Sequence, residues 1–152
     1  MAATKVATIS AQVDQSTLVD TMTGARDRID EHLRGAGARP TGEVWWVFHG
    51  MVTPDSEAPV EVCVPFDGTV DPAGPITVRM DPAHTQAYCT VTRDECSYPR
   101  IMAAYDAVHS WVRGAGRRPS GPTREVYCPG GVEAAGDQPF ALVAQPVQAD
   151  AS

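Results

Sequence analysis

The sequence predicts an α+β fold, in which duplicated strand-helix-strand-strand units form one antiparallel sheet and two helices flank a central cleft with pseudo-twofold symmetry. Three observations predict it: a nine-residue motif occurs twice, helix-spaced apolar residues precede each copy, and segments rich in strand-forming residues follow each copy. The length of 152 residues suits a single domain with its own core.

The repeated motif is RGAGARPTG at residues 34–42 and RGAGRRPSG at residues 113–121, an offset of 79 residues. Seven of the nine positions are identical. We therefore expect internal repeats at about residues 5–66 and 76–147, within one domain over residues 1–152 that has no DNA-binding domain.

A predicted helix precedes each motif, because apolar residues three and four apart form one stripe on a helix. The stripes are Met22, Ala25, Ile29 and Leu33, and then Ile101, Ala104, Val108 and Val112. Gly-Ala-Gly followed by proline is expected to end both helices. Ser97, with Pro99 just inside, predicts the start of the second helix, and Trp111 is expected in the core beside Val112.

Strands are predicted where β-branched and aromatic residues gather between turn signals. They span residues 6–13, 43–49, 59–65, 76–80, 85–92, 123–128 and 140–147. The turn signal Asp81-Pro82-Ala83 predicts that 76–80 pairs with 85–92. An exposed loop is expected over 130–138 and a frayed tail over 148–152.

Composition excludes several functional classes. The net charge is -7, with 12 basic and 19 acidic residues, which argues against direct binding of nucleic acid. No apolar run is long enough to span a membrane, and no secretion signal is visible, so we expect a cytoplasmic protein. A monomer or weak dimer is expected as well. Four cysteines and four histidines lack metal-ligand spacing, so we expect reduced thiols, no metal and no cofactor.

Glu125 is the leading candidate for a functional residue. Because side chains alternate along a strand, Glu125 and Tyr127 share one face. The 79-residue offset places Trp46 and Phe48 at the matching positions of the first repeat. If the repeats are related by pseudosymmetry, these four side chains wall a cleft where the two halves meet.

Such a cleft suits a bulky organic cation. Each aromatic face attracts a cation by roughly 0.5–2 kcal/mol, and one carboxylate supplies the matching charge. Desolvation is expected to raise the pKa of Glu125, so that a proton is released when a cation binds above about pH 6. The alternative is that Glu125 pairs with Arg124, Arg118 or a tyrosine near the sheet edge.

Four further residues are candidates for contact with a ligand. Glu61 is either a second cleft carboxylate or the solvated side of an alternating strand. Tyr105, in the second predicted helix, and Tyr88, in a strand, each either line the cleft or fill the core. Phe140, in the last strand, completes the set of ligand-binding candidates.

Several segments, in their order, resemble the GyrI-like small-molecule-binding domains, also called AraC-type or bacterial transcription activator effector-binding domains. They are YDAVHSW at 105–111, GRRPSGP at 116–122, REVY at 124–127 and VEVCVP at 60–65. The resemblance runs from about Val6 to Val147 and makes the chain similar to a standalone member. It implies two helices beside a hydrophobic cleft that accepts lipophilic, often cationic molecules, and a link to transcription regulation.

The resemblance leaves three functions open. The leading one is multidrug binding, in which the protein senses or sequesters lipophilic aromatic cations without turnover. The second is a hydrolase of cyclopropane-bearing or other electrophilic toxins, with Glu125 as general base and Tyr127 beside it. The third is a protein-interaction module similar to gyrase inhibitors, steered to a basic partner by the charge of -7.

Overall fold

The computed structural model describes residues 1–128 and 136–149 and confirms the α+β class. Most of the loop predicted over 130–138, and the last three residues of the predicted tail, lie outside the described residues. The chain divides into two compact units, one formed by residues 2–83 and one by residues 84–152 together with Met1. We call them the N-terminal and the C-terminal unit.

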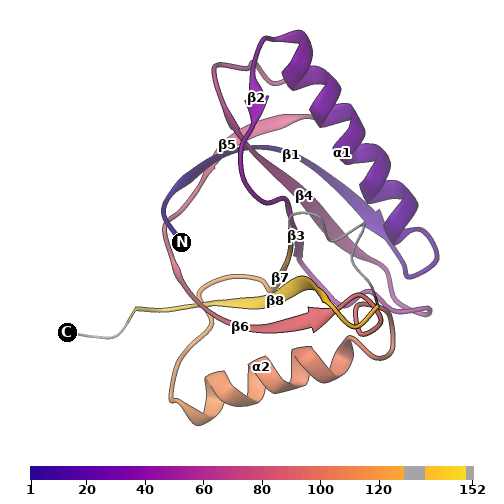
Figure 1. Ribbon diagram of the computed structural model, residues 1–152, viewed down its shortest axis with the longest axis vertical. Coiled ribbons are helices and arrows are strands. Elements are labelled where there is room, and N and C mark those ends of the chain that lie inside the picture. The colour runs from indigo at the N-terminus through magenta and orange to yellow at the C-terminus, as the bar shows by residue number, and fades with distance from the viewer. Residues whose placement is uncertain (129–135, 150–152) are drawn as a thin grey trace. The chain divides into compact units, whose positions relative to one another are not determined.

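The N-terminal unit is an antiparallel sheet with one helix. Its elements are β1 (Thr4–Val13), α1 (Leu18–Gly35), β2 (Arg39–Pro40), β3 (Trp45–Phe48), β4 (Ala58–Asp67) and β5 (Thr77–Asp81). The strand order is β5-β1-β4-β3, and β2 pairs with β4. The helix α1 lies along β1 and β4, and its predicted apolar stripe is buried against one face of the sheet (Figure 1).

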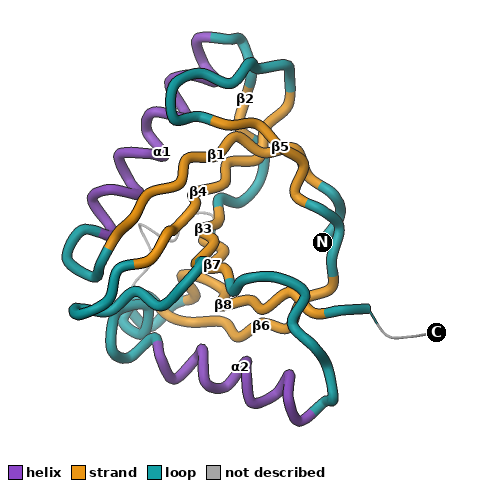
Figure 2. The backbone as a smooth tube through the Cα atoms, turned by 180° about the vertical axis from the view of Figure 1, so that it is seen from behind, coloured by secondary structure: helices purple, strands orange, loops and turns teal. Residues whose placement is uncertain are grey.

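The C-terminal unit repeats this plan with fewer strands. Its elements are β6 (Thr85–Thr92), α2 (Met102–Gly114), β7 (Arg124–Tyr127) and β8 (Pro139–Val147). The strand order is β7-β8-β6, and α2 lies along β8 and β6 (Figure 2). An isolated bridge between Pro119 and Val147 takes the place that β2 has in the other unit. The predicted strand-helix-strand-strand repeat is confirmed.

The predicted pairing of 76–80 with 85–92 is wrong. The strand β5 pairs with β1, with Arg79 opposite Val6 and Val78 opposite Ala7. Burial explains the choice, because this register places Val78, with Ile76 just before it, against the core beneath α1. The segment Asp81-Pro82-Ala83 consequently leads from one unit to the next instead of closing a hairpin.

Two predictions about α2 are also wrong. The helix begins at Met102, not near Ser97, and residues 97–101 form a turn before it in which the Ile101 N–H donates to the Ser97 carbonyl at 2.9 Å. Trp111 is 58% exposed although its neighbour Val112 is buried. Successive helix positions are about 100° apart, so Trp111 lies off the buried stripe.

As predicted, a glycine in the left-handed region terminates each helix, two residues beyond the last helical residue. Gly37 has φ 72° and Gly116 has φ 69°, and no atom lies within 4 Å of a Cβ built on either one. Replacing either glycine with alanine is expected to lower the free energy of unfolding by about 1 kcal/mol, because only the backbone conformation opposes the new methyl group.

Gly35 and Gly114 provide matched controls for this prediction. Each ends its helix without a positive φ, and each has open space for a Cβ. Alanine at these two positions is expected to leave stability unchanged or raise it. Urea denaturation of the four variants measures the difference, and equal effects at all four positions would contradict the assignment.

Candidate functional site

A buried carboxylate in the C-terminal unit receives three hydrogen bonds from uncharged donors. The hydroxyl of Tyr105 donates to Glu125 Oε2 at 2.6 Å, and that of Tyr127 donates to Glu125 Oε1 at 2.9 Å. The thiol of Cys96 donates to the same Oε1 at 3.9 Å. We call these four residues the Glu125 cluster.

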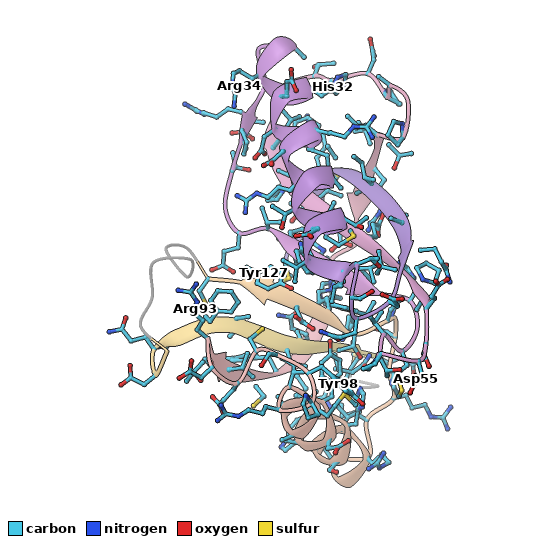
Figure 3. All side chains as sticks on the ribbon, turned by 90° about the vertical axis from the view of Figure 1, so that its right-hand side faces the viewer. His32, Arg34, Asp55, Arg93, Tyr98 and Tyr127 are labelled. Atoms are coloured by element: carbon cyan, nitrogen blue, oxygen red, sulfur yellow. The ribbon has the colours of Figure 1, made fainter. Side chains whose placement is uncertain are left out.

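Sheet register and helix packing bring the cluster together. Glu125 lies opposite Val143 and Tyr127 opposite Ala141, and both partners belong to the core that α2 covers. Glu125 and Tyr127 therefore lie on the helix-facing side of the sheet. Tyr127 is labelled among the side chains drawn in Figure 3. The helix lies along β8 and β6, so Tyr105 reaches β7 from the flank of the helix.

The electrostatics of the cluster centre on Glu125, which is only 8% exposed. Desolvation raises its pKa, and the hydrogen bonds from Tyr105, Tyr127 and Cys96 oppose this shift only in part. Burial and the nearby carboxylate hold the pKa of both tyrosines well above 10, so they remain neutral donors. Burial and Glu125 raise the pKa of Cys96 to about 12.

Within residues 1–128 and 136–149, no lysine, arginine or histidine forms an ion pair with Glu125. The predicted pairing with Arg124 or Arg118 is therefore absent there, and the tyrosine alternative is the one that the structure shows. Neutral donors solvate the carboxylate without cancelling its charge. The cluster consequently offers a cation a charge partner inside an apolar unit.

Aromatic rings extend the cluster on both sides. Tyr127 packs edge to face against Phe140, with ring centroids 5.9 Å apart. Tyr105 packs in the same way against His109 at 6.2 Å, and His109 Nε2 lies 3.2 Å from the Thr123 hydroxyl. Phe140, predicted from sequence as a ligand contact, thus lies beside the Glu125 cluster.

Tyr88 lies apart from the Glu125 cluster. It pairs with Ala144, which pairs in turn with Arg124, so all three lie on the sheet face away from α2. Its side chain is 61% exposed. The sheet therefore separates Tyr88 from Glu125.

Trp46 and Phe48 occupy in the N-terminal unit the places that Glu125 and Tyr127 occupy in the C-terminal one. They lie opposite Val62 and Val60 and pack against the core beneath α1. Each pair therefore lies on the helix-facing side of the sheet in its own unit. That all four side chains line one common cleft remains a prediction from the sequence repeat.

Glu61 lies on the opposite side of its sheet, away from α1, and forms an ion pair with Arg79. Arg79 donates from Nη2 to Glu61 Oε1 at 2.9 Å and from Nε to Glu61 Oε2 at 3.3 Å. Its Nη1 donates to Asp81 at 3.1 Å, and His49 Nε2 lies 3.8 Å from Glu61. Burial raises the pKa of Glu61, but the hydrogen bonds and charge of Arg79 outweigh it and bring the pKa below its usual value.

Cys96, Arg79 and Asp81 are the residues that sequence reasoning missed. Cys96 lies 29 positions before Glu125, in a turn whose path no sequence pattern indicates. A signal for Arg79 was available, because Thr77, Arg79 and Asp81 alternate with apolar residues and mark one polar strand face.

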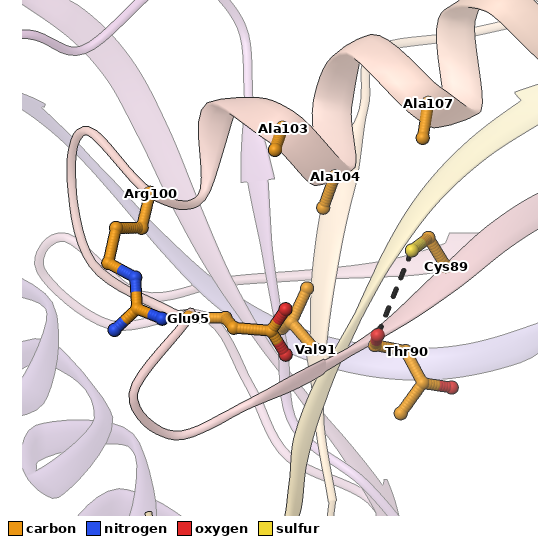
Figure 4. Close-up of a pocket in the computed structure, with 8 residues that line it drawn as sticks. All are labelled: Cys89, Thr90, Val91, Glu95, Arg100, Ala103, Ala104 and Ala107. Carbon is orange, nitrogen blue, oxygen red and sulfur yellow. Dashed lines mark hydrogen bonds between the residues drawn. The ribbon is translucent and has the colours of Figure 1, made fainter. Parts of the chain in front are cut away.

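A small pocket of about 170 Å³ lies between α2 and β6 (Figure 4). Three alanines of α2, three residues of β6 and two charged residues from the turn between them line this pocket. They are Cys89, Thr90, Val91, Glu95, Arg100, Ala103, Ala104 and Ala107. Cys89 and Glu125 lie on the same face of the sheet, but Val143 of β8, which pairs with both, separates them. The pocket is therefore separate from the Glu125 cluster.

Residues 1–128 and 136–149 contain no group of three histidine, cysteine, aspartate or glutamate side chains placed to hold a metal ion. No helix among them combines the length and the apolar character that crossing a bilayer requires.

Known proteins resemble this chain in their structure alone. No family model and no curated protein matches the sequence. The EcmrR C-terminal domain superposes with a TM-score of 0.80 at 18% identity, covering 97% of this chain and 93% of the domain. The EcmrR chain in the EcmrR–DNA complex superposes with a TM-score of 0.76 at 17% identity, and this protein spans 55% of the length of that EcmrR chain.

Two other proteins share the fold more distantly. A Staphylococcus aureus MU50 protein, provisionally assigned to bacterial transcription regulation, superposes with a TM-score of 0.59 at 12% identity, covering 98% of this chain and 95% of that one. A hydrolase from Listeria innocua superposes with a TM-score of 0.58 at 8% identity, covering 97% and 88%. The chain therefore has the fold of the EcmrR C-terminal domain, a fold that also occurs in a hydrolase.

Proposed function

We propose that this protein binds lipophilic aromatic cations at the Glu125 cluster and acts as an effector-binding or sequestering domain of the GyrI-like kind. The observation that carries the proposal is a carboxylate, 8% exposed, that meets only neutral donors among the described residues. The fold shared with EcmrR, which occurs in a DNA complex, supports a link to transcription.

Desolvation explains why the ligand would be a soft organic cation. A delocalised, weakly hydrated cation loses little hydration on entering an apolar site, whereas a compact ammonium ion loses much more. The rings of Tyr105, Tyr127 and Phe140 offer faces and edges to such a ligand, and Glu125 supplies the opposite charge. Trp46 and Phe48 stay predicted contacts.

Glu125→Gln tests the proposal, because it removes the charge and keeps the shape. Binding of tetraphenylphosphonium, measured by isothermal titration calorimetry, is expected to weaken about 10- to 100-fold, the equivalent of about 1.5–3 kcal/mol for a charged interaction. Asp106→Asn is the matched control, since Asp106 is exposed on α2 and its loss changes net charge equally. Equal binding by Glu125→Gln and the parent protein would overturn the proposal.

A hydrolase is the second candidate, and two observations favour it. The raised pKa of Glu125 makes its carboxylate a stronger base, and the Tyr105 and Tyr127 hydroxyls can stabilise developing negative charge. The fold also occurs in a hydrolase from Listeria innocua. Mass spectrometry after incubation with a cyclopropane-bearing electrophile distinguishes the two functions, since only the hydrolase releases a product with water added.

A further inference from the structure

A nucleophile and a base stand side by side in the Glu125 cluster. The Cys96 thiol donates to Glu125 Oε1, the same oxygen that accepts the Tyr127 hydroxyl. A thiol must lose its proton to become a strong nucleophile, and the Glu125 carboxylate, to which the thiol already donates a hydrogen bond, is placed to receive that proton.

The same arrangement keeps the thiol unreactive while the site is empty. Burial and the negative charge of Glu125 raise the pKa of Cys96 to about 12, so almost no thiolate is present near neutral pH. A cation that binds Glu125 offsets this negative charge and thereby removes one of the two causes. The positive charge of a ligand would therefore both guide it to Cys96 and make that thiol easier to ionise.

We propose that Cys96 covalently captures cationic electrophiles that bind at Glu125, with Glu125 as the group that receives the thiol proton. The proposal rests on cation binding at Glu125, as proposed above, and names a substrate class for the same site: cation-bearing Michael acceptors and other soft, thiol-reactive molecules. With a Michael acceptor, an S–C bond forms at the β-carbon, and the π electron pair moves to the α-carbon, which takes up the proton from Glu125. No oxidant or reductant is needed.

Two methanethiosulfonates of opposite charge test the proposal on the full chain. In each reaction the Cys96 sulfur forms an S–S bond, methanesulfinate leaves with the electron pair, and the thiol proton passes through Glu125 to solvent. The trimethylammonium reagent is expected to label Cys96 at least about tenfold faster than the sulfonate reagent. In Glu125→Gln this preference is expected to disappear.

The sequence supplies an internal control for the labelling. Trypsin cleavage after Arg79, Arg93 and Arg100 places Cys89 and Cys96 on separate peptides, so mass spectrometry measures both rates in one sample. Cys89 lies in the pocket between α2 and β6 and donates to the Thr90 carbonyl, outside the Glu125 cluster. Its rates in Glu125→Gln are expected to match the parent, which also shows that the variant is folded.

The outcomes distinguish this inference from the proposed function. Equal labelling of Cys96 by the two reagents in the parent, or a charge preference that survives in Glu125→Gln, would overturn covalent capture. Tetraphenylphosphonium binding that does not depend on Glu125 would overturn the proposed function. If that binding depends on Glu125 while Cys96 shows no charge preference, reversible binding stands and capture alone fails.

Discussion

Arg79→Met is expected to lower the free energy of unfolding by about 2–4 kcal/mol, because it leaves two buried carboxylates without their shared cation. The guanidinium donates to both Glu61 and Asp81, whose side chains are 11% and 3% exposed. The range stays below that of a fully buried pair because the Arg79 side chain is 34% exposed and water screens part of its charge. Urea denaturation near pH 7 measures the loss.

The double variant Arg79→Met, Glu61→Gln separates charge from packing. Removing the charge of Glu61, one of the two carboxylates that Arg79 contacts, is expected to restore part of the lost stability, which a packing defect at Arg79 would not allow. A further loss in the double variant would contradict the argument.

The direction of the pH effect provides a second check on Arg79. The pKa of Glu61 is lowered in the folded parent, so its stabilising effect is present above its unfolded pKa and is lost as pH falls through the folded value. Without Arg79, desolvation dominates and raises the pKa, so ionised Glu61 opposes folding and protonation relieves the cost. The stability gap between variant and parent is therefore expected to narrow as pH falls. His49, whose Nε2 lies 3.8 Å from Glu61 Oε1, is a lesser cause of the lowered pKa of Glu61 in the parent.

Local patterns in the sequence predicted the parts of this fold that local physics determines. Both apolar stripes, at spacings of three and four, are buried, and both Gly-Ala-Gly segments end a helix. Strand alternation correctly placed Glu125 and Tyr127 on one face. These features depend on residues within a few positions of one another.

Features that depend on distant partners could not be predicted in this way. The pairing of β5 with β1 joins segments about 70 residues apart, and the burial of Val78 decides it. The contact of Cys96 with Glu125 depends on the path of the turn before α2. Alternation also shows that Tyr88 and Thr90 share a face, but not that α2 covers the other one.

Cation affinity is expected to depend on pH through Glu125. A permanently charged ligand favours the ionised carboxylate, so binding lowers the pKa of Glu125 and releases a proton wherever the empty site is protonated. Because burial raises that pKa above the ordinary 4.5, the loss of affinity on acidification begins at a higher pH than for an ordinary glutamate. Below the raised pKa, affinity falls by up to about tenfold per pH unit, and above it affinity is constant.

Tetraphenylphosphonium is the suitable probe for this dependence because the ligand itself does not titrate. Tyr105 and Tyr127 stay protonated, with pKa values well above 10, and the Cys96 thiol does so with a pKa of about 12. His109 is in ring contact with Tyr105, and histidine is a residue type that can gain positive charge on acidification. Its protonation would also repel a cation and has to be separated from that of Glu125.

Glu125→Gln makes this separation. A slope that disappears in the variant belongs to Glu125, whereas a slope that persists there and disappears in His109→Gln belongs to the imidazole. Dissociation constants measured by calorimetry between about pH 4 and 8 in two buffers of different ionisation enthalpy give both the slope and the number of protons released. A parent protein whose affinity is constant over that range and releases no proton would show that the cation does not meet the Glu125 carboxylate, whatever residue it contacts instead.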